Sequence, residues 1–153
     1  MKIEGAKILV TGGAGLIGST TIDQLLANEN PAEIVILDNM SRGTTRNLES
    51  ALKDERVKLI QGDIRDKNLV YKVTEGMDAV IHMAAIRITA CAADPREAME
   101  VMNDGTFNVI DAAHKAGVKK VLAASSASIL GLADSFPTTE DHHPYNNRTW
   151  YGA

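Results

Sequence analysis

A chain of 153 residues is long enough for one domain with a sizeable core, and 44% hydrophobic and 24% charged residues are typical of a globular protein. A net charge of −4 without a run of lysine or arginine argues against nucleic acid or an anionic membrane as a partner. The single cysteine, Cys91, excludes an internal disulfide. With no apolar leader and no membrane-length apolar run, we expect a cytoplasmic protein that does not touch a membrane.

Short apolar runs alternate with longer helical segments along the chain. We expect five strands, at 7–10, 33–37, 57–61, 78–82 and 118–124. We expect helices at 16–27, 66–74 and 94–116, with room for a short helix within 41–52. From residue 132 the chain is polar and is predicted to be a loop, which includes Pro137 and Pro144.

The helix boundaries carry their own signals. Leu16, Ile17, Thr20, Leu25 and Leu26 lie mostly on one side of the first helix, which predicts a buried face. Asp66 and Asp94 stand where a side chain caps free N–H groups of a first turn. Pro95 suits the first turn of a helix, and Gly117 suits the residue that ends one.

Continuous apolar strands separated by helices predict a parallel sheet with helices on both faces. The right-handed crossover rule then gives an α/β fold with a doubly wound parallel sheet (a Rossmann fold), with strand order 3-2-1-4-5. Ligands of such sheets bind beyond the carboxyl ends of the strands. Each motif described below follows a predicted strand at that end.

The strongest local signal is the segment 11–18, TGGAGLIG, between the first strand and the first helix. Gly12 permits a tight turn, Gly15 lets the backbone approach a pyrophosphate, and Gly18 lets the helix pack close to the sheet. The free N–H groups at the start of the helix favour an anion there. The alternative, a plain glycine-rich turn, explains the spacing less well.

A carboxylate follows each of the next two strands. Asp38 stands twenty positions after Gly18, where it can accept hydrogen bonds from the ribose hydroxyls and repel a 2′-phosphate, which favours NAD over NADP, although Arg42 is nearby. Asp63 stands where a carboxylate reaches the adenine amino group. As alternatives, Asp38 is a helix cap or turn residue and Asp63 is an ordinary turn aspartate.

The fourth and fifth strands end in small and hydroxyl residues. The segment 82–85, His-Met-Ala-Ala, lets a cofactor lie close to the backbone, and His82 is better explained as a satisfied core histidine than as a base. Ser125 and Ser126 follow the fifth strand, and Tyr151 comes twenty-five residues after Ser126. Read alone, these serines are turn residues and Tyr151 is an exposed aromatic.

Together these residues resemble the extended short-chain dehydrogenase/reductases, especially enzymes of the UDP-galactose 4-epimerase type. The resemblance runs through 11–18, Asp38-Asn39, 62–65, 82–85, 125–131 and Tyr151, and so covers essentially the whole chain. It implies an NAD-binding domain over 1–153. The expected NAD contacts are Gly12, Gly15, Leu16, Ile17, Gly18, Asp38, Asn39, Ser41, Arg42, Gly43, Asp63, Ile64, Met83, Ala84, Ala85, Arg87 and Ala124.

The same resemblance assigns catalysis to two residues. Ser126 hydrogen-bonds the reacting oxygen, and Tyr151 is the acid/base of a Tyr-x-x-x-Lys motif whose lysine would be residue 155, beyond this sequence. The family's substrate-gripping half would also follow, so we expect the isolated chain to be catalytically incomplete. Two positions depart from the family pattern, because Leu130 replaces a tyrosine and Met102 replaces an asparagine that Asn103 offers one residue later.

The resemblance implies an epimerase that acts on a UDP-sugar or another nucleotide sugar, as a homodimer in its full-length form. A 4,6-dehydratase is the nearest alternative, but resembling dehydratases carry Asp-Glu where this chain has Ala127-Ser128. A reductase or decarboxylase of the family and a non-catalytic NAD-binding module stay open. No metal is expected, because the adjacent His142 and His143 lack cysteine partners and do not easily converge on one ion.

Overall fold

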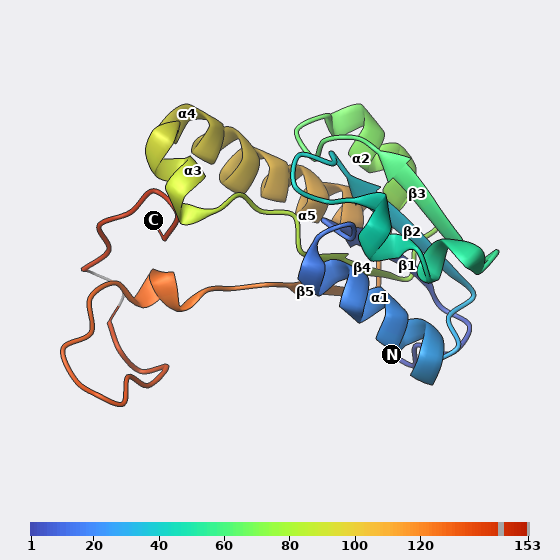
Figure 1. The fold of residues 1–153 in the computed structure, drawn as a ribbon, viewed down its shortest axis with the longest axis horizontal. Helices are drawn as coiled ribbons and strands as arrows, with labels where there is room; N and C mark the ends of the chain where they lie inside the picture. Colours follow the sequence, from blue (N-terminus) through green and yellow to red (C-terminus); the bar gives the residue numbers. More distant parts are fainter. Residues whose placement is uncertain (144–145, 153) are drawn as a thin grey trace.

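The computed structural model describes residues 1–143 and 146–152; Pro144 of the predicted loop and Ala153 lie outside the described residues. A parallel sheet of five strands organises the chain (Figure 1). The strands are β1 (Lys7–Thr11), β2 (Glu33–Asp38), β3 (Val57–Gln61), β4 (Ala79–His82) and β5 (Lys120–Ala123). Their order, β3-β2-β1-β4-β5, confirms the predicted doubly wound topology.

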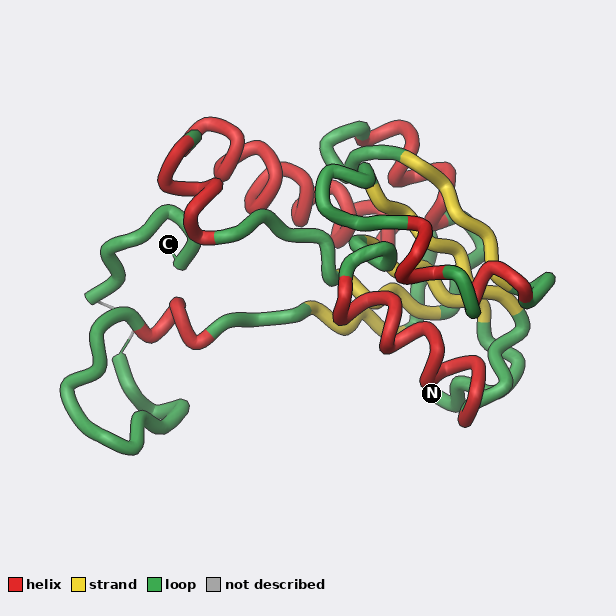
Figure 2. The backbone as a smooth tube through the Cα atoms, viewed as in Figure 1, coloured by secondary structure: helices red, strands yellow, loops and turns green. Residues whose placement is uncertain are grey.

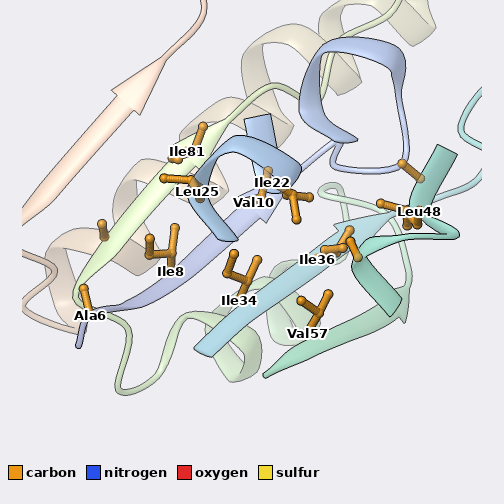
Figure 3. Close-up of a cluster of buried hydrophobic side chains, with 13 residues drawn as sticks. Ala6, Ile8, Val10, Ile22, Leu25, Ile34, Ile36, Leu48, Val57 and Ile81 are labelled. Carbon is orange, nitrogen blue, oxygen red and sulfur yellow. The ribbon is translucent and has the colours of Figure 1, made fainter. Parts of the chain in front are cut away.

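One face of the sheet is covered by α1 (Leu16–Asn28) and by two short 3₁₀ helices, η1 (Thr45–Leu48) and η2 (Ala51–Lys53). Figure 3 shows the resulting core, in which strand residues such as Ile8, Val10 and Ile36 meet Ile22 of α1 and Leu48 of η1. Each of these five side chains is at most 1% exposed. Burial of this apolar surface anchors α1 and the glycine-rich turn before it.

The predicted buried face of α1 is wrong in the first turn of the helix. Ile22 and Leu25 are buried, but Leu16 and Ile17 are 77% and 69% exposed. Gly18 and Ser19 occupy the buried side of this turn instead. The helix starts at the end of the sheet, so its first turn lies beyond the apolar strand residues that would cover Leu16 and Ile17.

The opposite face is covered by α2 (Lys67–Thr74) and α5 (Thr106–Lys115), which pack on Leu9, Leu37 and Val80. The predicted cap of α2 is present, because the Asp66 side chain accepts a hydrogen bond from the backbone N–H of Leu69 at 3.0 Å. Helices therefore lie on both faces, as the sequence predicts.

The region predicted as one helix over 94–116 is more complex. It consists of α4 (Pro95–Ala98), a π-helical segment η3 (Met99–Gly105) and α5, and an additional short helix, α3 (Ile88–Ala93), precedes it. The Asp94 carboxylate caps α4 by accepting from the N–H groups of Arg96 and Glu97, both at 3.0 Å. The start of this helical region is thus confirmed, and its uniform α-helical character is wrong.

Strand β5 is not buried on two faces as the sequence pattern predicts. Val121 is 37% exposed and Leu122 is 52% exposed, because β5 lies at the edge of the sheet and contributes no residue to either apolar core. After β5 the chain continues as a loop with one helical turn, η4 (Ala127–Leu130), which Figure 2 shows clearly. Among the described residues, no helix has the length and hydropathy to cross a bilayer.

Candidate functional site

A cavity of about 570 Å³ lies at the carboxyl ends of the strands. Every residue expected to contact NAD lines it: Gly12, Gly15, Leu16, Ile17, Gly18, Asp38, Asn39, Ser41, Arg42, Gly43, Asp63, Ile64, Met83, Ala84, Ala85, Arg87 and Ala124. Other lining residues were not expected: Leu37, Asn47, Gly62, Ile86, Val101 and Ser125.

The sequence indicates some of these additional lining residues but not others. Gly62 and Ser125 belong to the segments 62–65 and 125–131, which resemble family motifs, so their place in the site could have been predicted. Val101 belongs to η3 and reaches the cavity from a helical segment in which the chain departs from the family pattern, at Met102. Only the tertiary packing of η3 brings it to the site.

The glycine-rich turn is shaped by close backbone contacts. Gly12 has φ +69°, and a Cβ there would lie 2.7 Å from the backbone nitrogen of Ala84. A Cβ on Gly18 would lie 2.5 Å from the Gly12 carbonyl oxygen. Gly15 differs, because its Cβ would meet only the Gly12 oxygen, at 3.3 Å. Gly12 and Gly18 are therefore required by the fold, whereas Gly15 leaves open space toward the cavity.

The N-terminus of α1 begins at Gly15 without a side-chain cap and without an acidic residue in its first turn. The first N–H groups of a helix lack partners within the helix and carry the positive end of its dipole. Because Gly15, Leu16 and Ile17 line the cavity, these N–H groups could hold an anion there. Arg42 and Arg87, both exposed, add positive charge from the loops after β2 and β4.

Asp38 ties two cavity loops together. Its carboxylate accepts hydrogen bonds from the backbone N–H groups of Ala14 at 2.9 Å and of Met40 at 2.8 Å, and the residue is only 8% exposed. Each bond occupies one oxygen, and a carboxylate offers about four acceptor positions. Asp38 thus keeps acceptor capacity for hydroxyl groups in the cavity.

Asp63 is more fully engaged than the sequence suggests. Its oxygens accept from Arg65 through the backbone N–H, Nε and Nη2 at 2.9, 3.0 and 2.8 Å, and from the Asn39 amide at 3.0 Å. The Arg65 guanidinium, more than any other group, lowers the pKa of Asp63 to about 2. A ligand amino group must displace one of these donors to bind Asp63.

His82 lies behind the cavity and is 6% exposed. Its Nδ1 is 2.6 Å from the Thr11 hydroxyl, and its Nε2 is 3.1 Å from the Thr106 hydroxyl. Burial lowers the pKa of His82, which favours the neutral ring. Thr11 also accepts from the backbone N–H of Ala84, at 3.4 Å. His82 therefore joins the ends of β1 and β4 to α5, as a satisfied core histidine.

The two residues expected to act in catalysis lie differently. Tyr151 lines the cavity, as does Ser125. Ser126 is not among the lining residues; its hydroxyl accepts from the backbone N–H of Ser128 at 3.1 Å and caps η4. The tail is held close to this turn, because a Cβ on Gly152 would lie 2.5 Å from the Ser128 carbonyl oxygen.

The structure corrects the expectation that the adjacent histidines do not converge. One ligand atom from each of Asp134, His142 and His143 lies within 4.8 Å of the others. The backbone turns after Thr139, where the His142 N–H bonds the Thr139 carbonyl at 3.1 Å, and both rings end on the side of Asp134.

Comparison with known proteins gives a consistent result. The sequence profile of the NAD dependent epimerase/dehydratase family matches residues 8–153. The UDP-glucose 4-epimerase of Mycolicibacterium smegmatis is 39% identical over 150 residues, which are 96% of this chain and 47% of that protein. The chain thus spans about half the length of the curated relatives it matches.

Two solved structures agree with this comparison. The dTDP-glucose 4,6-dehydratase DesIV of Streptomyces venezuelae, solved with NAD, superposes with a TM-score of 0.88 at 35% identity, covering 95% of this chain and 47% of that one. The UDP-Glc/GlcNAc 4-epimerase of Campylobacter jejuni also gives a TM-score of 0.88, at 30% identity, with 97% and 45% covered.

Proposed function

The chain belongs to the NAD-dependent epimerase/dehydratase family, and on that premise we propose that it is the NAD-binding half of a nucleotide-sugar epimerase of the UDP-glucose 4-epimerase type. The observation that carries the proposal is that Gly15, the start of α1, Asp38 and Tyr151 all line the same cavity. The homodimer expected of the full-length protein stays a prediction.

The cavity fits NAD in its charge and its shape. The uncapped start of α1 and the space at Gly15 suit a pyrophosphate, because N–H groups face it and no side chain blocks it. Asp38 suits the adenosine ribose, whose hydroxyls donate hydrogen bonds, and it disfavours the 2′-phosphate of NADP. When bound, NAD supplies a hydride acceptor that takes hydride from a sugar carbon and returns it to the other face.

Side chains of this chain would carry out the proton transfer in that reaction. Tyr151 holds and returns the proton of the reacting sugar hydroxyl at its phenol oxygen. Ser126 orients the reacting oxygen, and for this its hydroxyl must turn from the N–H of Ser128 toward the cavity. A positive neighbour that stabilises the phenolate would assist this role, and the lysine of the Tyr-x-x-x-Lys motif is the group expected to supply it.

A 4,6-dehydratase is the second candidate, favoured by the similarity to DesIV. Elimination of water needs an acid and a base beside the hydroxyl residue that follows β5. In this chain, the two residues that follow Ser126 are Ala127 and Ser128, and neither carries a carboxyl group that could serve as that acid or base. Epimerisation requires neither of these groups and is the better supported reaction.

Turnover of UDP-glucose, UDP-galactose and their N-acetyl forms tests the proposal. We expect a longer form of the chain, with the length of its relatives, to interconvert at least one pair, whereas these 153 residues bind NAD without turnover. Loss of water from the sugar would instead identify a dehydratase. Equal epimerase activity of the two forms would contradict the proposal that this chain is only the NAD-binding half.

A further inference from the structure

The loop after η4 is closed at its base. The Leu132 N–H donates to the carbonyl oxygen of Asn146 at 3.1 Å, and a Cβ on Gly131 would lie 2.4 Å from the Asn146 carbonyl carbon. Asp134 therefore stands on the outgoing arm of the loop, while His142 and His143 stand on the returning arm. An interaction between the side chain of Asp134 and that of His142 or His143 therefore links the two arms of the loop.

The three side chains already contact one another. His143 Nε2 lies 2.6 Å from the Asp134 Oδ2, and the two imidazole rings are 4.4 Å apart with a tilt of 35°. His142 and His143 are half-buried, whereas Asp134 is exposed. One nitrogen from each ring and one carboxylate oxygen fall within 4.8 Å of one another. Two imidazoles and a carboxylate form a donor set that many metal sites use.

The hydrogen bonds of His142 show which of its nitrogens carries a lone pair and could bind an ion. Its Nδ1 is 2.8 Å from the carbonyl oxygen of His143, which only accepts, so Nδ1 carries the hydrogen. Its Nε2 accepts from the Asp134 backbone N–H at 3.1 Å and so presents a lone pair. A metal-bound histidine usually donates its other N–H to a carbonyl or carboxylate in this way.

We propose that Asp134, His142 and His143 bind a divalent first-row transition ion, with Zn²⁺ as the reference ion, and that the ion clips the two arms of the loop together. The ion takes the place of the hydrogen bond between His143 Nε2 and Asp134 Oδ2, and the neutral His143 ring binds it in the tautomer that carries its hydrogen at Nδ1 rather than at Nε2. The ion also binds His142 at Nε2, which releases the Asp134 N–H. Donor atoms about 2.0–2.2 Å from a tetrahedral zinc lie more than about 3 Å from one another, so His143 Nε2 and Asp134 Oδ2 must separate from 2.6 Å, and donors nearer the 4.8 Å limit must move closer together. Water completes the coordination.

The chemistry of the donors selects the ion. Imidazole nitrogens suit Zn²⁺, Co²⁺ and Ni²⁺, whereas Mg²⁺ and Ca²⁺ prefer oxygen donors. The site lies on the segment between Ser126 and Tyr151, so the ion would order the chain between the two residues assigned to catalysis. This inference does not depend on which sugar nucleotide the protein uses.

Titration of the 153-residue chain with Zn²⁺ against a chelating dye tests the proposal, and the absorption of bound Co²⁺ provides a second measurement. We expect one ion per chain, with affinity about 10- to 100-fold weaker in each of Asp134→Asn, His142→Ala and His143→Ala. His114→Ala is the matched control, since it removes an exposed histidine of α5, and it should leave the affinity unchanged.

Hydrogen exchange adds a readout on the loop itself. Zn²⁺ should slow exchange across 132–143 in the wild type and not in His143→Ala. Absence of stoichiometric Zn²⁺ binding by the folded wild type would overturn the proposal and leave a hydrogen-bonded cluster without an ion. Unchanged affinity in the three variants would overturn it equally, because the ion would then bind elsewhere.

Discussion

Replacement of Gly15 by valine separates cofactor binding from folding. Gly15 is the N-cap of α1, with φ −71° and ψ 169°, an extended conformation that β-branched residues adopt readily. A Cβ there meets one atom, the Gly12 oxygen, at 3.3 Å, so we expect an unfolding free energy within about 1 kcal/mol of wild type. In contrast, Gly18→Ala places a Cβ 2.5 Å from the same oxygen and should destabilise the fold itself.

The effect of Gly15→Val on NAD follows from the same geometry. The isopropyl group occupies the space that a pyrophosphate needs in front of the first N–H groups of α1, and we expect affinity to fall at least about 100-fold, which is about 2.7 kcal/mol. At one hundred times the wild-type Kd, NAD stabilises the wild type by about 2.7 kcal/mol, a rise in Tm of roughly 5–11 °C for a chain of this size. The variant should gain less than roughly 2 °C under the same conditions.

Calorimetric titration together with thermal unfolding measures both quantities. A folded Gly15→Val chain that binds NAD within a few-fold of wild type would refute the assignment of the turn at 11–18 to the pyrophosphate. A Gly18→Ala chain with unchanged stability would refute the argument that this glycine is required by close packing.

Three further changes test the groups around the cavity. Because burial lowers the pKa of His82 below its ordinary 6.5, the native state binds fewer protons there than the unfolded state, and the unfolding free energy should fall as the pH drops below about 6.5. Urea unfolding at several pH values should show a smaller fall in His82→Gln. An identical pH profile in wild type and variant would contradict the role given to burial. Arg65→Gln should raise the pKa of Asp63 from about 2 toward 3.8, so that the variant loses less unfolding free energy than wild type between about pH 4 and pH 2. Carboxyl NMR titration measures the pKa of Asp63, and an unchanged value in the variant would contradict the ion pair. Tyr151→Phe in the longer form should lower turnover at least about 100-fold while leaving NAD affinity unchanged, and comparable turnover would remove Tyr151 from catalysis.

The sequence predicts those parts of the fold in which local pattern and backbone geometry agree. The five apolar runs give the strands, and the crossover rule gives their order. Asp66 and Asp94 cap helices where the sequence places the caps. The loops after the strands could be assigned to one site because the carboxyl ends of parallel strands share an edge of the sheet.

Other features depend on tertiary contacts that no local pattern contains. The π-helical segment η3 brings Val101 to the cavity, and a Cβ on its Gly105 would lie 2.6 Å from Cδ1 of Ile64. Val121 is exposed because β5, at the edge of the sheet, contributes no residue to either apolar core. Likewise, the turn after Thr139 brings His142 and His143 to Asp134, although adjacency in the sequence argues against it.

We predict that this chain is an NAD-binding domain whose Asp38 faces the adenosine ribose. Titration of NAD and NADP into the wild type and into Asp38→Ala, with urea unfolding to verify the fold, tests it most directly. We predict saturable binding of NAD, one per chain, with at least about tenfold preference over NADP, and loss of that preference in Asp38→Ala. Equal affinity of the wild type for both cofactors, or an unchanged preference in the folded variant, would contradict the claim.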